Sequence, residues 1–165
     1  MLEGNLLATL RHLTEGEIQF ILVGGLAAVL NGAPINTFDV DVVYSTEAAN
    51  IERILGCLEA LDAVFRLQPD RRLKPDRSHL TRRGHVNLIT RLGLLDLLGT
   101  IGEGLGYEEL LPHSTEMEIG DGLRIRVLKL ETIITTKEQA GSEKDLSSLP
   151  ILRRTLIELQ QLEKD

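Results

Sequence analysis

The sequence contains no tryptophan, a single cysteine and only five phenylalanine and tyrosine residues in 165. Single-stranded nucleic acids are held largely by stacking of bases on aromatic side chains, so a binding surface of that kind is not expected. Cys57 cannot form a disulfide within the chain, which favours a reducing compartment. We therefore expect a cytoplasmic protein.

Long hydrophobic runs are also missing. The longest, residues 20–23 and 92–98, are far too short to cross a bilayer, and the N-terminus lacks the basic and apolar regions of a signal peptide. The 42% apolar and 26% charged residues are typical of globular proteins. We expect one domain over residues 1–165, with a core at about 18–149, a C-terminal helical segment at 144–163 and no membrane association.

Positive charge is scarce except in one segment. The chain carries a net charge of −7, whereas residues 66–91 hold eight basic residues against two acidic ones, which leaves −13 for the remainder. The basic residues are Arg66, Arg71, Arg72, Lys74, Arg77, Arg82, Arg83 and Arg91. This basic segment is either a solvated loop or a local binding site for a polyanion such as RNA.

Hydrophobic periodicity predicts interleaved helices and strands. Helical spacing favours helices at 2–13, 26–31, 129–140 and 144–162, the last interrupted near Pro150, a helix capped by Ser45 or Thr46 that runs to about 61, and a helical turn at 107–111. Strands are expected at 19–23 and 39–44, with hairpins from 86–89 and 94–98 and from 115–119 and 123–128. This order indicates an α/β (α+β) domain with a mixed sheet flanked by helices.

Two neighbouring elements carry residues suited to phosphate chemistry. Gly24 and Gly25 follow a buried strand and begin a helix, where backbone N–H groups can meet a phosphate, although such a pair often marks only a tight turn. Asp39 and Asp41 lie two apart on the next strand and so share one face. Two carboxylates on a valine-rich strand repel each other unless a cation such as Mg²⁺ neutralises them, or unless they are simply exposed.

These residues resemble a known family. The segments Val23-Gly24-Gly25-Leu26, Gly32-Ala33-Pro34 and Thr37-Phe38-Asp39-Val40-Asp41 are similar to the nucleotidyltransferase superfamily of DNA polymerase β, particularly to small bacterial AbiEii-like and toxin–antitoxin nucleotidyltransferases. The resemblance spans roughly residues 20–149. It implies that Gly24, Gly25 and Thr37 contact the phosphates and that Asp39 and Asp41 hold metal.

The third carboxylate of the family pattern corresponds to Asp96, in the segment 93–98. Asp96 is also a lone charge in an apolar run, and such charges are seldom buried unpaired. Asn87 is the competing third position, but it is a neutral ligand and a poorer base, so we favour Asp96. The alternative is that Asp96 lies on the solvent-exposed side of a helix.

Lys137 and Lys144 lie in the C-terminal segments that resemble the family. If one helix runs through Gly141, both lysines share a face and can bind a triphosphate; otherwise they are a solvated pair. Asp145 is expected to cap the last helix or to orient Lys144. The histidines His12, His79, His85 and His113 show no metal-ligand spacing.

The resemblance implies transfer of a nucleoside monophosphate from a nucleoside triphosphate to an acceptor hydroxyl on RNA, tRNA or a small molecule. Two Mg²⁺ ions held by Asp39, Asp41 and Asp96 would assist, with Asp96 as the base. The chain departs from the family at Ile35 and at residues 142–143, where relatives carry arginine. The alternative is therefore a non-catalytic nucleotide-binding domain or a toxin–antitoxin-like partner domain. A homodimer or a cognate partner protein would fit either hypothesis.

Overall fold

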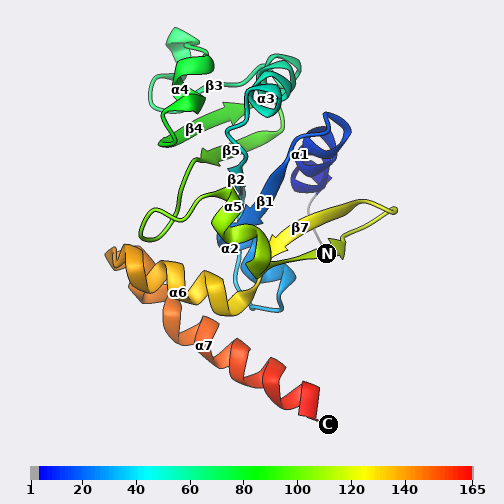
Figure 1. Cartoon of the computed structure of the whole chain (residues 1–165), viewed down its shortest axis with the longest axis vertical. Coiled ribbons are helices and arrows are strands. Elements are labelled where there is room, and N and C mark those ends of the chain that lie inside the picture. The colour runs from blue at the N-terminus through cyan, green and yellow to red at the C-terminus, as the bar shows by residue number, and fades with distance from the viewer. Residues whose placement is uncertain (1–3, 165) are drawn as a thin grey trace.

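The alternating and apolar segments of the sequence form one seven-stranded sheet (Figure 1). The computed structural model describes residues 4–164. The strands are β1 (Phe20–Val23), β2 (Asp39–Tyr44), β3 (Val64–Phe65), β4 (His85–Thr90), β5 (Gly93–Leu98), β6 (Ser114–Glu118) and β7 (Arg124–Leu128), in the spatial order β3-β4-β5-β2-β1-β7-β6. Parallel β2–β5 and β1–β7 pairs stand beside antiparallel ones, so the sheet is mixed.

The helices flank this sheet. They are α1 (Gly4–Glu15), α2 (Gly24–Leu30), α3 (Ala48–Ala60), α4 (Arg77–Thr81), α5 (Tyr107–Leu110), α6 (Leu130–Ala140) and α7 (Glu143–Lys164), with short 3₁₀ turns η1 (Pro69–Arg71) and η2 (Leu111–His113). Figure 1 shows α1 and α3 on one side of the sheet, with α2, α5 and α6 on the other. This arrangement confirms the predicted fold class. Within residues 4–164, no helix combines the length and the apolar character needed to cross a membrane.

The burial pattern of β2 and β5 shows which face of each strand packs into the core. Val40, Val42, Leu95 and Leu97 are buried, whereas Asp39, Asp41 and Asp96, which alternate with them, are only partly buried. One face of these two strands therefore packs into the core. The other face is left partly open, and the aspartates lie on it.

The beginning of α3 differs from the prediction. Neither Ser45 nor Thr46 is the N-cap; that position is Glu47, which makes no side-chain cap hydrogen bond. The Ser45 hydroxyl accepts a hydrogen bond from the Glu47 N–H, and its backbone carbonyl accepts one from the Asn50 side chain. Ser45 is buried, and these two hydrogen bonds hold the turn between β2 and α3 ahead of the N-cap residue.

The predicted interruption of the last helix is wrong. α7 continues from Glu143 to Lys164 with Pro150 inside it. Proline removes one helical hydrogen bond, to the carbonyl four residues earlier. Pro150 and Leu146 are both exposed, so water can reach the backbone there. Leu149 and Leu152 are buried and hold this part of the helix against the body of the protein.

Two further differences lie at the N-terminus and in the basic segment. The predicted first helix begins at Leu2, which lies outside the described residues; within them, α1 runs from Gly4 to Glu15. The basic segment contains α4, which the sequence analysis did not predict. Asp76 caps this helix by accepting hydrogen bonds from the Ser78 and His79 N–H groups.

Candidate active site

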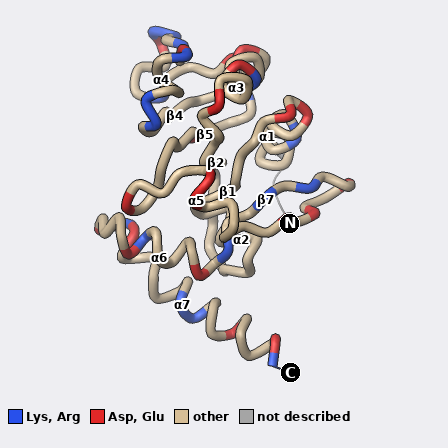
Figure 2. The backbone as a smooth tube through the Cα atoms, in the orientation of Figure 1, with Lys and Arg blue, Asp and Glu red and all other residues tan. Residues whose placement is uncertain are grey.

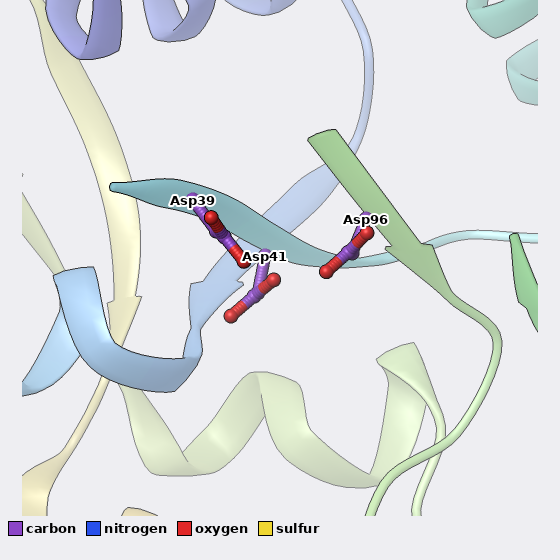
Figure 3. A group of neighbouring side chains, drawn as sticks. All are labelled: Asp39, Asp41 and Asp96. Atoms are coloured by element: carbon purple, nitrogen blue, oxygen red, sulfur yellow. The ribbon is translucent and has the colours of Figure 1, made fainter. Parts of the chain in front are cut away.

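Strand pairing brings three carboxylates together. β2 and β5 are parallel, and Asp41 is the register partner of Asp96, while Asp39 precedes Asp41 by two residues on the same face. One ligand atom from each aspartate lies within 4.8 Å of the others, and all three side chains are partly buried. In Figure 3 the three carboxylates gather on one side of the two strands. We call Asp39, Asp41 and Asp96 the aspartate triad.

The triad is electrostatically strained at Asp41. Burial, the hydrogen bond with Asp96 and the negative charges of Asp96 and Asp39 together raise the pKa of Asp41 to about 7, and the positive charge of Lys144 partly opposes them. Without a cation, the group therefore holds a proton near neutral pH. A divalent cation would remove the need for that proton and could be held by the same oxygens.

Asn87 lies on the far side of Asp96 from Asp41. It is the register partner of Asp96 on β4 and is exposed. The order of the strands therefore places Asp96 between Asp41 and Asn87. Asp96 is on a strand, not on a helix, and it is the member of this pair that joins the triad.

Two glycines lie close to the side chains of Asp41 and Thr37. A Cβ atom built on Gly24 would lie 2.3 Å from Asp41 Oδ2, and Gly24 has a φ of +71°, which side chains rarely adopt. A Cβ atom on Gly25 would lie 3.0 Å from Thr37 Oγ1. The glycines therefore admit a carboxylate and a hydroxyl close to the backbone at the end of β1.

A cavity of about 680 Å³ opens beside the triad. Asp39 and Asp41 line it together with Gly24, Gly25 and Thr37. Lys137 and Lys144 line it as well, as do Ser142 and Asp145. Negative and positive side chains thus share one hollow, which suits a metal-bound polyanion.

The two lysines share the cavity although the condition stated for a shared helix face is not met. No single helix runs through Gly141: α6 ends there with a φ of +66°, and α7 begins at Glu143. The turn between the helices brings Lys137 and Lys144 to the same hollow. Asp145 lies 3.5 Å from Lys137 (Oδ1 to Nζ), and its backbone N–H donates to the Ser142 hydroxyl, so Ser142 caps α7.

The cavity also has an apolar wall that the sequence analysis did not identify. Ile35, Phe38, Leu98 and Ile101 line it, and the Phe38 residue is 69% exposed. His85 lines it too, with its Nε2 3.2 Å from the Thr100 carbonyl oxygen. The sequence offered one signal for this wall: His85 begins an alternating strand and lies on the same face of that strand as Asn87.

Most of the basic segment does not reach this site. Three of its residues pair with carboxylates in or just after α3: Arg72 with Asp62, Lys74 with Glu59 and Arg77 with Glu52. Figure 2 shows the corresponding cluster of basic and acidic residues around α3 and α4, away from the middle of the sheet. The exception is Arg66, which forms an ion pair with Asp96.

Comparison with known proteins places the fold. No family model and no curated protein matches the sequence. A solved structure of TM1012 from Thermotoga maritima, a protein to which nucleotidyltransferase activity is attributed, matches with a TM-score of 0.55 and 17% identity over 93% of this chain and 91% of that one. The lincosamide antibiotic adenylyltransferase LnuA, with lincomycin bound, matches with a TM-score of 0.62 and 14% identity over 93% and 97%. The chain therefore has the fold of these nucleotidyltransferase structures.

Proposed function

We propose that this protein is a Mg²⁺-dependent nucleotidyltransferase, which moves a nucleoside monophosphate from a nucleoside triphosphate to an acceptor hydroxyl. The observation that carries the proposal is the aspartate triad beside a cavity that also contains Lys137 and Lys144. Carboxylates alone would repel a triphosphate, and lysines alone would not hold a metal. The fold shared with nucleotidyltransferase structures supports the same conclusion.

The donor set fits Mg²⁺. The triad offers carboxylate oxygens, which are the ligands this ion prefers, and the raised pKa of Asp41 marks a charge that a cation would neutralise. When bound, Mg²⁺ would offset charge on the phosphates and favour ionisation of the acceptor hydroxyl.

The remaining roles fall to residues on either side of the triad. Lys137 and Lys144 bind the phosphates as positive charges, and Thr37 and the backbone at Gly24 and Gly25 contact the same groups. Asp96, at the opposite end of the triad from Gly24, accepts the proton of the acceptor hydroxyl.

The acceptor that the cavity suits best is a small molecule. Ile35, Phe38, Leu98 and Ile101 offer apolar contacts, as expected of a small-molecule pocket. An RNA acceptor would need positive charge from the basic segment beside the cavity, yet none of the arginines and lysines of that segment lines it. LnuA, by its description, acts on a lincosamide antibiotic, which is a small-molecule acceptor.

A second function, nucleotide binding without transfer, is favoured by one observation. At the positions where the family resemblance implies arginines, Ile35 presents an apolar side chain to the cavity and Ser142 is engaged as the cap of α7. Fewer charges are then available for the phosphates. A role as a partner domain of toxin–antitoxin type remains a prediction.

Labelled triphosphates distinguish these functions. The purified protein would be incubated with each nucleoside triphosphate, Mg²⁺ and either total RNA or hydroxyl-bearing antibiotics such as lincomycin. Label on a small molecule, lost in Asp41→Asn but kept in the exposed control Asp62→Asn, is the expected result. Label on RNA would reverse the choice of acceptor, and bound nucleotide without any product would favour the second function.

A further inference from the structure

Arg66 is the residue of the basic segment that contacts the aspartate triad. It follows β3 directly, and its backbone N–H donates to the Asn87 carbonyl oxygen at 3.0 Å. Asn87 is the strand partner of Asp96, so this hydrogen bond fixes the base of the Arg66 side chain beside β4 and β5. The guanidinium then reaches Asp96 and forms the ion pair.

The ion pair makes the three carboxylates unequal. Asp39 and Asp41 line the cavity that holds the two lysines, whereas Asp96 carries its own counter-ion on the opposite side. The Asp96 side chain is only 14% exposed and that of Arg66 is 32% exposed. An ion pair with this little access to water is weakly screened, so the positive charge acts strongly on Asp96.

The arginine is held mainly by that carboxylate. Its Nε–H is buried and has no hydrogen-bond acceptor among the described residues. A buried donor without an acceptor is unfavourable, so the guanidinium keeps this place although one of its own groups is unsatisfied. The charge of Asp96 is the interaction that offsets this cost.

We propose that Arg66 competes with a divalent cation for Asp96 in the nucleotide-free protein. The inference rests on the proposed function, because it takes the triad to be the cation site. Arg66 is a positioning residue that acts through Asp96 and takes no part itself in the transfer. It lowers the affinity of the nucleotide-free protein for free cations. The cation therefore enters together with the nucleotide, whose phosphates add negative charge.

Cation binding without nucleotide tests this directly. Mn²⁺ would be titrated into the full chain by calorimetry, using wild type, Arg66→Met and Arg66→Lys. Removing one positive charge beside a divalent ion should tighten Mn²⁺ binding on the order of tenfold. Arg66→Lys keeps the charge and should stay near wild type. Arg66→Gln is a second neutral variant, and thermal melts confirm that each variant is folded.

Arg72→Met is the matched control, because it removes the same charge from an exposed ion pair outside the cavity. It should leave Mn²⁺ binding unchanged. An Asp96→Asn background tests the route: if Arg66 acts through Asp96, Arg66→Met should change Mn²⁺ affinity much less there than in wild type.

Two results would overturn the inference in different ways. Unchanged or weaker Mn²⁺ binding in both Arg66→Met and Arg66→Gln, with wild type binding normally, would reject the competition and leave the proposed function standing. No Mn²⁺ binding by any variant, either alone or together with a nucleoside triphosphate, would reject the cation site itself, and the proposed function with it.

Discussion

Asp41→Asn should stabilise the cation-free protein at alkaline pH. Asp41 ionises near pH 3.8 in the unfolded chain and near pH 7 in the folded one. The folded state therefore binds the proton more tightly, and stability falls as pH rises from about 4 to about 7. Below this range the carboxyl is protonated in both states and contributes nothing; above it the full cost of an ionised Asp41 is present.

The size of the effect follows from the shift. A rise of about three pKa units corresponds to roughly 4 kcal/mol, and the hydrogen bonds that asparagine cannot reproduce reduce this gain. For a chain of 165 residues, each kcal/mol moves the melting temperature by about 2–4 °C. We expect Asp41→Asn to melt several degrees higher than wild type at pH 8 in EDTA, and to show little difference near pH 4.

Thermal melts at both pH values are the assay, with Asp62→Asn as the control. Asp62 is in an exposed pair with Arg72, and its loss should cost little at either pH. A lower melting temperature for Asp41→Asn than for wild type at pH 8 in EDTA would refute the reasoning. It would mean that the carboxylate stabilises the fold through a contact that outweighs the repulsion.

Two further substitutions and one addition test the site. Gly24→Ala should lower stability by more than about 1 kcal/mol and displace Asp41, because its Cβ would lie 2.3 Å from Oδ2 at a φ of +71°; Gly56→Ala, with nothing within 4 Å, should be neutral or stabilising in the same melts. Lys144→Met should weaken binding of a Mg²⁺–triphosphate complex by about tenfold in calorimetry, whereas Lys74→Met should not, and equal losses would remove Lys144 from the phosphate site. Adding Mg²⁺ together with a nucleoside triphosphate at pH 8 should raise the melting temperature of wild type but not of Asp41→Asn, and an equal rise in both would place the cation elsewhere.

The strand-borne part of the site could be predicted because its signals are local. The period of two places Asp39 and Asp41 on one face, and the same period makes Asp96 a lone charge between buried leucines. The hairpin between β4 and β5 was also recognisable from its turn. That β5 pairs with β2 in a register that aligns Asp41 with Asp96 depends on the whole sheet, and here the family resemblance supplied what local pattern could not.

Lys137 and Lys144 line the same cavity without sharing a helix. A shared face for Lys137 and Lys144 was expected only if one helix ran through Gly141, but Gly141 adopts a left-handed conformation and ends α6. Glycine at that position already indicates a helix end. The direction that the chain takes after such an end is set by the packing of α7, which the sequence pattern does not reveal.

Ion pairs between residues far apart in the chain could not be predicted from the sequence. The basic segment could be recognised as a cluster of charge, but its partners Glu52, Glu59 and Asp62 lie earlier in the chain. The contact between Arg66 and Asp96 joins residues thirty positions apart through β4. The uninterrupted helix at Pro150 depends likewise on tertiary packing, by Leu149 and Leu152, which outweighs the loss of one hydrogen bond.

Binding of a nucleoside triphosphate with and without Mg²⁺ tests the central claim most directly. The claim is that the aspartate triad holds the cation through which the triphosphate is bound. Calorimetric titration of ATP and the other triphosphates into wild-type protein should show binding in Mg²⁺ and none in EDTA, because uncompensated carboxylates repel phosphate. Equal binding in Mg²⁺ and in EDTA would contradict the account, since the triphosphate would then lie outside the triad.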